Sequence, residues 1–249
     1  MRVLIPIAGP YDAFKEKGYL YSKNLIEVQG KPLIQHVYEK LQLLPEAKFI
    51  FIVNREEIER FHIDNVLKLL SPSCTIFTAE NTTAGAACTA LLAIEEIENN
   101  EPLLIVNGDQ IIEHNIAEII EVFNRRALDG GIITFDSVHP RWSYVKVDEQ
   151  GYVVEAAEKR PISRMATAGF YYFKHGYDFA QSAMETIRKD ARVDGKFYIC
   201  PCYNEMVLKQ QKIGIFTIPR SEYFSLASPQ GVEEYEKHVK PISGGNHAG

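Results

Sequence analysis

Lysines and a glycine follow the first apolar segment of this 249-residue chain in a pattern suited to phosphate binding. Gly9 lets the backbone approach a ligand closely, and Lys15, Lys17 and Lys23 could each neutralise a phosphate oxygen. Neither G-x-x-x-x-G-K nor G-x-G-x-x-G occurs, so a Walker loop and a dinucleotide-binding loop are poorly supported. The pattern indicates a phosphate-binding loop of another kind, although any single lysine could equally be a solvated surface charge.

Asp109 stands directly after an apolar segment and a glycine. At the end of a buried strand, such a carboxylate could hold a hard cation such as Mg²⁺ against phosphate oxygens. An aspartate that caps a helix or shapes a turn gives the same pattern. Both interpretations therefore stay open from the residue types alone.

An acid and a base stand together at Glu158 and Lys159. The combination suits a hydroxylated phosphoester, because a carboxylate accepts from hydroxyls and an ammonium meets phosphate; an exposed ion pair at a strand end is equally consistent. Gly169, inside an apolar segment, indicates either close approach of a ligand or a bulge. Gly85, among alanines that open a helical segment, indicates either exposed helix amides or tight packing.

The segments around these residues predict an α/β fold. Apolar and β-branched runs predict strands, and apolar residues three and four positions apart predict helices. In chain order the expected elements are strand 3–7, a helix from 32, strand 49–53, helix 55–70, strand 75–80, helix 84–98, strand 103–109, helix 114–127 and strand 131–135. Such alternation implies a mostly parallel sheet sandwiched by helices, with ligands at the carboxyl ends of the strands.

After Pro140 the pattern changes to short, partly alternating segments, which predict a small antiparallel β insertion. The expected elements there are strands 143–147, 152–158 and 166–173, helices 176–190 and about 200–210, and strand 213–218. No linker or repeat divides the sequence. We therefore expect a single domain over residues 1–240 and a disordered tail over 241–249.

Composition is that of an ordinary globular protein and excludes several kinds of partner. With 46% apolar residues, 24% charged residues and a formal charge of −6, the chain offers no electrostatic attraction to nucleic acid or to an anionic membrane. No apolar run is long enough to span a bilayer, and no secretory signal is recognisable, so we expect a cytoplasmic protein. The four cysteines are few and unevenly spaced, which predicts buried free thiols rather than disulfides.

Taken together, these segments resemble the sugar nucleotidyltransferases, which join an NTP to a sugar 1-phosphate. The resemblance extends from Arg2 to about Glu236, and it is carried most specifically by SKNLIEVQGKPLIQHV, LLIVNGDQII and VVEAAEKRPISRMATAGFYYF. It implies a GT-A-like α/β fold, Mg²⁺ as cofactor, and in-line attack of the sugar phosphate on the α-phosphorus with release of pyrophosphate. No covalent enzyme intermediate is needed, so catalysis would consist of positioning and charge neutralisation.

The resemblance also implies roles for individual residues. Lys23 would neutralise the α-phosphate region, and Asp109 would hold Mg²⁺. Glu158 would bind sugar hydroxyls, Lys159 would grip the sugar phosphate as a third catalytic residue, and Gly169 would border the sugar. The residues expected to contact the nucleotide are Ala8, Gly9, Glu80, Gly85, Asn107 and Gly108.

The chain departs from the family pattern in three places. Tyr11 stands where the first loop of the family has its second glycine, and Ala13 stands where that loop has an arginine that contacts the triphosphate. Ser22 and Asn24 replace the prolines that flank the family's lysine. Ser225 stands where the family often has a second metal-binding aspartate. The lost arginine removes one charge-assisted contact to a triphosphate.

Three functions therefore stay open. The first is nucleotidyl transfer to a sugar phosphate or a related phosphate, with Lys15 or Lys17 in place of the lost arginine; we favour it because the four charged residues of the family site occur together. The second is a glycosyltransferase that uses a finished nucleotide-sugar, and the third is a non-catalytic homologue that binds a nucleotide or sugar phosphate. By resemblance, the product would serve capsule or lipopolysaccharide synthesis. The base, the sugar and homo-oligomer formation cannot be read from the sequence.

Overall fold

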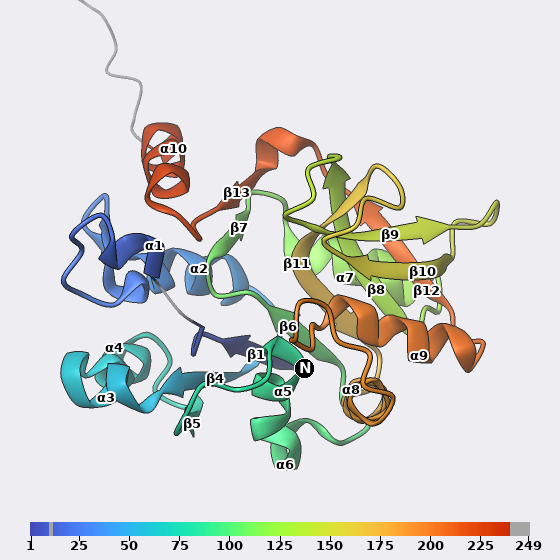
Figure 1. The fold of residues 1–249 in the computed structure, drawn as a ribbon, viewed down its shortest axis with the longest axis horizontal. Helices are drawn as coiled ribbons and strands as arrows, with labels where there is room; N and C mark the ends of the chain where they lie inside the picture. Colours follow the sequence, from blue (N-terminus) through green and yellow to red (C-terminus); the bar gives the residue numbers. More distant parts are fainter. Residues whose placement is uncertain (10–11, 240–249) are drawn as a thin grey trace, which may run out of the picture.

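A nine-stranded mixed sheet forms the centre of the molecule, with two two-stranded ribbons beside it (Figure 1). The computed structural model describes residues 1–9 and 12–239. The strands are β1 (Arg2–Pro6), β2 (Glu27–Val28), β3 (Lys31–Pro32), β4 (Lys48–Asn54), β5 (Thr75–Ala79), β6 (Leu103–Val106), β7 (Gln110–Ile112), β8 (Gly130–Asp136), β9 (Ser143–Val147), β10 (Val153–Glu158), β11 (Met165–Phe173), β12 (Ile213–Thr217) and β13 (Tyr223–Ser225). The helices are α1 (Asp12–Lys15), α2 (Leu33–Leu41), α3 (Arg55–Phe61), α4 (Ile63–Leu70), α5 (Ala86–Ala90), α6 (Ile94–Ile97), α7 (Ile116–Arg125), α8 (Gly176–Arg188), α9 (Tyr203–Leu208) and α10 (Pro229–Val239).

The first half of the chain supplies the parallel part of the sheet. Strands β6, β1, β4 and β5 lie next to one another in this order, and neighbours run parallel. Strand β11 joins this part to the rest of the sheet, because it pairs antiparallel with β6, β8 and β9. Strands β9 and β10 form an antiparallel pair, and β12 runs parallel to β8. The predicted α/β class, with an antiparallel insertion after Pro140, is confirmed.

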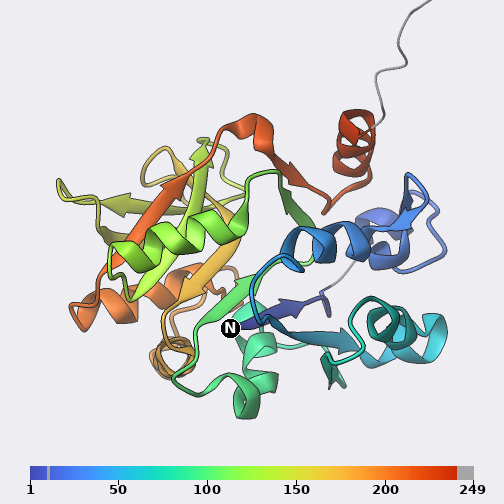
Figure 2. The ribbon, with the colours of Figure 1, turned by 180° about the vertical axis from the view of Figure 1, so that it is seen from behind.

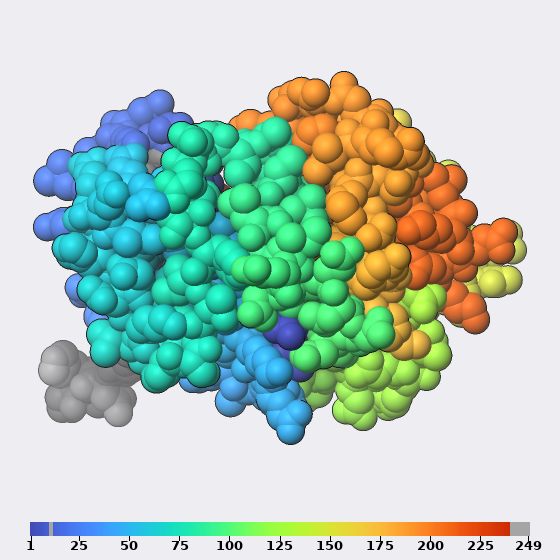
Figure 3. All heavy atoms as spheres, turned by 90° about the horizontal axis from the view of Figure 1, so that it is seen from below, coloured from blue at the N-terminus to red at the C-terminus, as the bar shows by residue number. Residues whose placement is uncertain are grey.

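Helices cover both faces of the sheet. Helices α2 and α7 lie on the face toward the viewer in Figure 2, whereas α5, α8 and α9 lie on the face toward the viewer in Figure 1. Alternate residues of β1 serve the two faces, since Val3 and Ile5 belong to the core under α2 and α7 and Leu4 belongs to the core under α5 and α8. Seen from below, the segment that contains α5 and α6 lies against the segment that contains α8 (Figure 3).

Most predicted elements differ from the structure by one or two residues at an end, and three differ in a way that affects the fold or the site. The helix predicted over 55–70 divides into α3 and α4, because His62 adopts a left-handed conformation with φ of 50°. The segment 84–98 forms two short helices, α5 and α6, joined by a 3₁₀ turn. The strand predicted over 103–109 is shorter, since β6 ends at Val106. The chain therefore turns before it reaches Asp109.

Helix α10 is an element that the sequence analysis did not predict. It packs on α2, where the ring of Tyr235 meets the ring of His36 edge-on with centroids 5.4 Å apart. The predicted tail over 241–249 lies outside the described residues. Within residues 1–9 and 12–239, none of the helices has both the length and the apolar character needed to cross a membrane.

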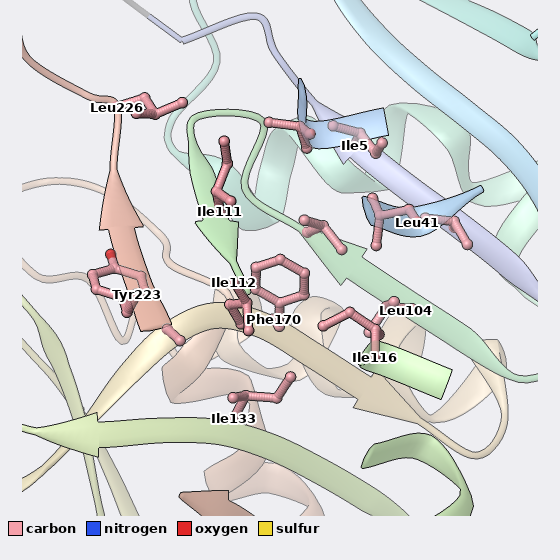
Figure 4. Packing of buried hydrophobic residues seen from close by; sticks show 14 of the residues in the cluster. Ile5, Leu41, Leu104, Ile111, Ile112, Ile116, Ile133, Phe170, Tyr223 and Leu226 are labelled. Carbon is pink, nitrogen blue, oxygen red and sulfur yellow. The ribbon is translucent and has the colours of Figure 1, made fainter. Parts of the chain in front are cut away.

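The ribbon formed by β7 and β13 holds the segment around Asp109. Ile111 and Ile112 of β7 lie near Phe170 in the buried core (Figure 4). Strand β13 pairs antiparallel with β7, and the amide nitrogen of Leu226 donates to the carbonyl oxygen of Asp109 at 2.7 Å. The backbone of Asp109 is thus fixed from two sides, which keeps its side chain at the edge of the sheet.

Candidate active site

Two adjoining cavities open at the carboxyl ends of the parallel strands. The first has a volume of about 260 Å³ and lies between the segments that follow β1, β5 and β6. The second has a volume of about 480 Å³ and is bordered by β7, the end of β10 and β11. They share Ala86, Asn107, Asp109 and Tyr198 as lining residues. This is the edge of the sheet at which the strand order predicted a ligand site.

Lys23 and Asp109 meet where the two cavities join. The Nζ atom of Lys23 lies 2.7 Å from Oδ2 of Asp109, and the lysine is only 8% exposed. The lysine comes from the 3₁₀ turn Lys23–Leu25, and the aspartate comes from the turn between β6 and β7. The structure thus brings these two predicted residues together, with one positive and one negative group placed to hold a phosphate and its counter-cation.

A buried carboxylate anchors the turn that carries Lys23. Glu57 of α3 is 2% exposed and accepts hydrogen bonds from the Ser22 hydroxyl at 2.7 Å and from Asn24 Nδ2 at 3.2 Å. Ser22 Oγ also accepts from the amide nitrogen of Asn24 at 3.2 Å, which caps the turn. Burial raises the pKa of the Glu57 carboxyl. Hydrogen bonds to Glu57 therefore fix this turn, at the positions where the family has stiff proline rings.

Replacing Glu57 with alanine is expected to lower the free energy of unfolding by about 1–3 kcal/mol, because it removes the acceptor of the buried Ser22 hydroxyl and one acceptor of the buried Asn24 amide. Chemical denaturation measures the change. Glu59→Ala is the matched control, since Glu59 lies on the same helix with its side chain 63% exposed and should change stability by less than about 0.5 kcal/mol. Equal effects of the two substitutions would show that Glu57 does not anchor the turn.

Glu158, which the sequence analysis assigned to sugar hydroxyls, lines the second cavity, and its contact with a sugar stays a prediction. Its carboxylate accepts a hydrogen bond from the Ser143 hydroxyl, across the β9–β10 pair. Burial raises the pKa of Glu158, and the Ser143 hydrogen bond opposes that rise. A half-buried carboxylate with one oxygen already bonded is suited to accept further hydrogen bonds from hydroxyl groups of a ligand.

The effect of Glu158→Gln on stability is expected to depend on pH. The unfolding free energy of the variant should increase relative to that of wild type as pH rises. A carboxyl whose pKa is raised by folding stabilises the protein below its unfolded pKa, near pH 4.3, and this contribution is lost as pH rises through the folded pKa. The unfolding free energy of wild type should therefore fall relative to that of the variant as pH rises above about pH 4, in denaturant titrations at several pH values. Glu155→Gln, on the same strand, is the control, and a pH-independent difference for Glu158→Gln would contradict the expectation.

Lys159 lies outside both cavities. Its Nζ atom pairs with Asp194 at 2.9 Å and lies 5.5 Å from the centre of the Tyr198 ring. The Asp194 carboxylate holds the pKa of Lys159 above its ordinary value. Lys159 also has a left-handed φ of 53°, directly after β10 ends at Glu158. Contact between Lys159 and a sugar phosphate stays a prediction, and it requires the lysine to exchange Asp194 for phosphate.

Backbone conformation explains the two glycines, Gly85 and Gly169, for which the sequence left two interpretations open, and backbone packing adds to it at Gly85. Gly85 has φ of 125°, and a Cβ atom there would lie 2.3 Å from the carbonyl oxygen of Phe197. Gly169 has φ of 73° at a register shift of β11, and a Cβ atom there would lie 1.8 Å from Oε1 of Gln110. Gly85 also lines the first cavity and Gly169 the second. Backbone contact therefore requires glycine at position 85, and the positive φ favours glycine at both positions, whether or not a ligand approaches them.

The predicted nucleotide contacts divide into two groups. Five of them line the first cavity, namely Ala8, Gly9, Gly85, Asn107 and Gly108. Glu80 is absent from the described lining residues of both cavities, and its exposed carboxylate pairs with Arg55. Lys15 and Lys17 are likewise absent from those lining residues, so the structure does not bring them to the cavity in place of the lost arginine. Tyr11 lies outside the described residues.

The segment that contains Lys196 and Tyr198 also lines the first cavity, and it was not predicted from the sequence. The amide nitrogen of Phe197, between them, donates to the carbonyl oxygen of Ala84 at 2.8 Å, so the segment packs beside the start of α5. Gly195, with φ of 73°, makes the turn before it and was the one available signal. Among the described lining residues of the first cavity, Lys23 and Lys196 are the cations.

The donor groups fit Mg²⁺ that is held mainly through phosphate. Asp109 is the one carboxylate among the described lining residues of the first cavity. Ser225 pairs with Gln110 in the β7–β13 ribbon and lines the second cavity together with Asp109, so a hydroxyl replaces the family's second carboxylate in that lining. Over residues 1–9 and 12–239 no group of three His, Cys, Asp or Glu side chains could hold a metal ion. Mg²⁺ commonly binds through one or two carboxylates plus waters and substrate phosphates, so one carboxylate suffices.

The arrangement is typical of α/β proteins that bind nucleotides at the carboxyl ends of parallel strands. A family model described as Nucleotidyl transferase matches residues 19–209, which is more than half of the chain. The chain therefore belongs to the nucleotidyl transferase family, and the resemblance seen in the sequence is confirmed at this level.

Known relatives are similar over most of this chain at low identity. The crystal structure of a nucleoside-diphosphate-sugar pyrophosphorylase from Vibrio cholerae RC9 matches with a TM-score of 0.81 and 24% identity, over 94% of this chain and 99% of that one. The bifunctional protein GlmU of Methanococcus aeolicus is 25% identical over 200 residues, 78% of this chain. The UTP–glucose-1-phosphate uridylyltransferase AglF of Haloferax volcanii is 24% identical over 157 residues, 61% of this chain. The match spans 44% of the GlmU length and 63% of the AglF length.

Proposed function

We propose that this protein transfers a nucleotidyl group from an NTP to a sugar 1-phosphate or a related phosphate, giving an NDP-sugar and pyrophosphate. The observation that carries the proposal is the Lys23–Asp109 pair at the junction of two cavities. One cavity suits the nucleotide and the other suits the phosphate that attacks it. The pair lies where the α-phosphate of the NTP and the phosphate of the acceptor would have to meet.

In this proposal the first cavity takes the NTP. The small residues Ala8 and Gly9 leave room for the base and ribose, and Lys23 and Lys196 supply positive charge. A phosphate oxygen of the acceptor forms the new bond to the α-phosphorus while the bond to the bridging oxygen breaks and pyrophosphate leaves. Lys23 neutralises charge on the transferred phosphoryl group. Mg²⁺ held by Asp109 would supply charge neutralisation to the phosphate oxygens.

The second cavity takes the acceptor in this proposal. Glu158 and Ser143 border it on one side, and Gln110 and Gly169 border it on another. The Glu158 carboxylate accepts hydrogen bonds from sugar hydroxyls, and the Gln110 side chain adds an amide to the lining of the same cavity. Because no covalent enzyme intermediate is needed, these residues act by orienting the acceptor phosphate in line with the leaving group.

Pyrophosphate release tests the proposal. Thermal-shift measurements with ATP, CTP, GTP, UTP and dTTP, each with and without Mg²⁺, first identify the base, because a ligand at about 100 times its Kd stabilises by roughly 2.7 kcal/mol. The selected NTP is then combined with a panel of sugar 1-phosphates and alcohol phosphates. Mg²⁺-dependent pyrophosphate release supports nucleotidyl transfer, and its absence with every acceptor overturns it.

A second candidate is a glycosyltransferase that uses a finished nucleotide-sugar. It is favoured by one observation, namely that Ala13 replaces the family's triphosphate-binding arginine and is not among the described lining residues of either cavity. A diphosphate nucleotide needs no γ-phosphate contact. Consumption of an NDP-sugar with release of NDP, and no reaction with NTPs, would favour this candidate.

For either reaction we propose a cytoplasmic location and a role in surface polysaccharide synthesis.

A further inference from the structure

A third cavity adjoins the second one on the side of β13. It has a volume of about 150 Å³ and lies between β13, the start of α10 and the loop before β9. It shares Arg141, Ser225 and Ser228 with the second cavity, so a ligand in the second cavity can extend into it. Its remaining cation is Arg220. Two guanidinium groups therefore border one small space next to the proposed acceptor site.

These two arginines differ from almost all others in the chain. Of its eleven arginines, eight form ion pairs with carboxylates. Arg126 donates to two carbonyl oxygens away from the cavities. Within the described part of the chain, Arg141 and Arg220 have no carboxylate partner, although Arg220 donates to the carbonyl oxygen of Tyr223 at 2.7 Å. Both guanidinium groups thus keep donors for an external anion.

An aromatic cluster holds both guanidinium groups in place. Phe135, Trp142 and Tyr223 pack on one another, with ring centroids 4.3–5.6 Å apart. The guanidinium carbon of Arg141 lies 4.3 Å from the Trp142 ring centre, and that of Arg220 lies 5.3 Å from the Tyr223 ring centre. Stacking on buried rings orients an arginine before a ligand arrives and so lowers the entropy cost of binding an anion.

The charges around the third cavity also favour an anion. Glu234 is its one carboxylate among the described lining residues, and that carboxylate accepts a hydrogen bond from Gln230 at 3.0 Å. Ser225 supplies a neutral hydroxyl at the position where the family often has an aspartate. Two guanidinium groups against one carboxylate leave a net positive charge, and the hydroxyls of Ser225 and Ser228 can add donors.

We infer that the third cavity binds a second anionic group on the acceptor, separate from the phosphate that reacts. The acceptor is then a sugar phosphate that also carries a carboxylate or a further phosphate, because both anions match the planar donors of a guanidinium. This inference rests on the proposed function, since it assigns the second cavity to the acceptor. It narrows the acceptor class without naming one sugar.

Matched acceptors that differ only at one end test the inference. Calorimetry and pyrophosphate-release kinetics compare glucose 1-phosphate, glucuronic acid 1-phosphate and glucose 1,6-bisphosphate, with the corresponding galactose and mannose compounds as further sets. In at least one set we expect the Kd of a doubly anionic member to be at least about tenfold lower than that of the neutral sugar, as for a charge-assisted bidentate contact. Tighter binding of the uronic acid compound would identify a carboxylate as the bound group, and tighter binding of the bisphosphate would identify a phosphate.

Arginine variants locate the effect. Arg141→Gln and Arg220→Gln should each lower the ratio of the Kd for the neutral acceptor to the Kd for the doubly anionic acceptor toward one. Arg126→Gln is the control and should leave this ratio unchanged, because Arg126 also lacks a carboxylate partner among the described residues but lies away from the cavities. A preference that survives both cavity variants overturns the inference, and so does equal or weaker binding of the doubly anionic acceptors in every set. Turnover without any anionic preference overturns the inference and leaves the proposed function intact. Selective binding without pyrophosphate release from any acceptor overturns the proposed function and supports the anion site.

Discussion

Asp109→Asn is expected to lower the rate of pyrophosphate release by about a thousandfold or more. The change removes the one carboxylate among the described lining residues of the first cavity, and with it the charge proposed to hold Mg²⁺. It also leaves the ammonium of Lys23, now 2.7 Å from Oδ2 of Asp109, without its counter-ion. Steady-state kinetics over a range of Mg²⁺ concentrations measure the loss.

Asp136→Asn is the matched control for this experiment. Asp136 ends β8 and forms an exposed ion pair with Arg164 at 2.6 Å, away from both cavities, so its substitution should leave turnover within about twofold. Thermal unfolding of both variants shows whether the fold is kept. Full activity of a folded Asp109→Asn protein would remove Asp109 from the catalytic machinery and the metal assignment with it.

Lys23→Met is expected to lower kcat by about 100- to 1,000-fold, the usual effect of removing one preorganised group that neutralises transition-state charge. Methionine keeps much of the side-chain length and the apolar contacts of this nearly buried residue, so the loss reports the ammonium group. KM for the NTP should change less than kcat, because the charge on the transferred phosphoryl group is greatest in the transition state. Single-turnover kinetics separate the chemical step from product release.

Lys31→Met provides the control for the lysine experiment. Its side chain is 44% exposed and pairs with Glu39 at 2.9 Å, outside both cavities, so kcat should stay within about twofold. Lys23→Arg tests geometry, because it keeps the charge but changes its shape, and it should recover only part of the lost rate. If Lys23→Met raised KM and left kcat unchanged, Lys23 would contribute to ground-state binding and not to the chemical step.

Glu57 connects these two experiments to the local structure of the site. Because Glu57 binds both residues that flank Lys23, its removal should also reduce catalysis by letting the lysine move from Asp109. The sequence analysis gave Glu57 no role, since its distance along the chain from Ser22 and its place on the exposed-looking segment REEIERF gave no sign that it is buried. Only the packing of α3 against the loop shows the contact.

The position of the site could be predicted from the sequence because it depends on local patterns. Apolar runs of strand length alternate with helical segments, and this order requires a parallel sheet whose carboxyl edge gathers the residues that follow each strand. Gly9, Asn107 and Asp109 come soon after the ends of their strands, so their place at that edge follows from the order of the strands along the chain. The residue types of Lys23 and Asp109 could also be read from the sequence, and they predict contacts with phosphate and a metal ion.

The partners of the charged groups could not be predicted, because they come from segments distant in sequence. Glu80 and Lys159 carry the right charge for ligand contacts, yet Arg55 and Asp194 bind them in the folded chain. Conversely, nothing in the sequence pointed to Arg141 and Arg220, and only packing on one aromatic cluster places both beside the same cavity. The sequence by itself therefore determined which edge of the fold carries the chemistry, since strand order is a local property. Only the tertiary structure decided which charges stay available to a ligand, because ion pairing depends on distances between segments that the linear order does not contain.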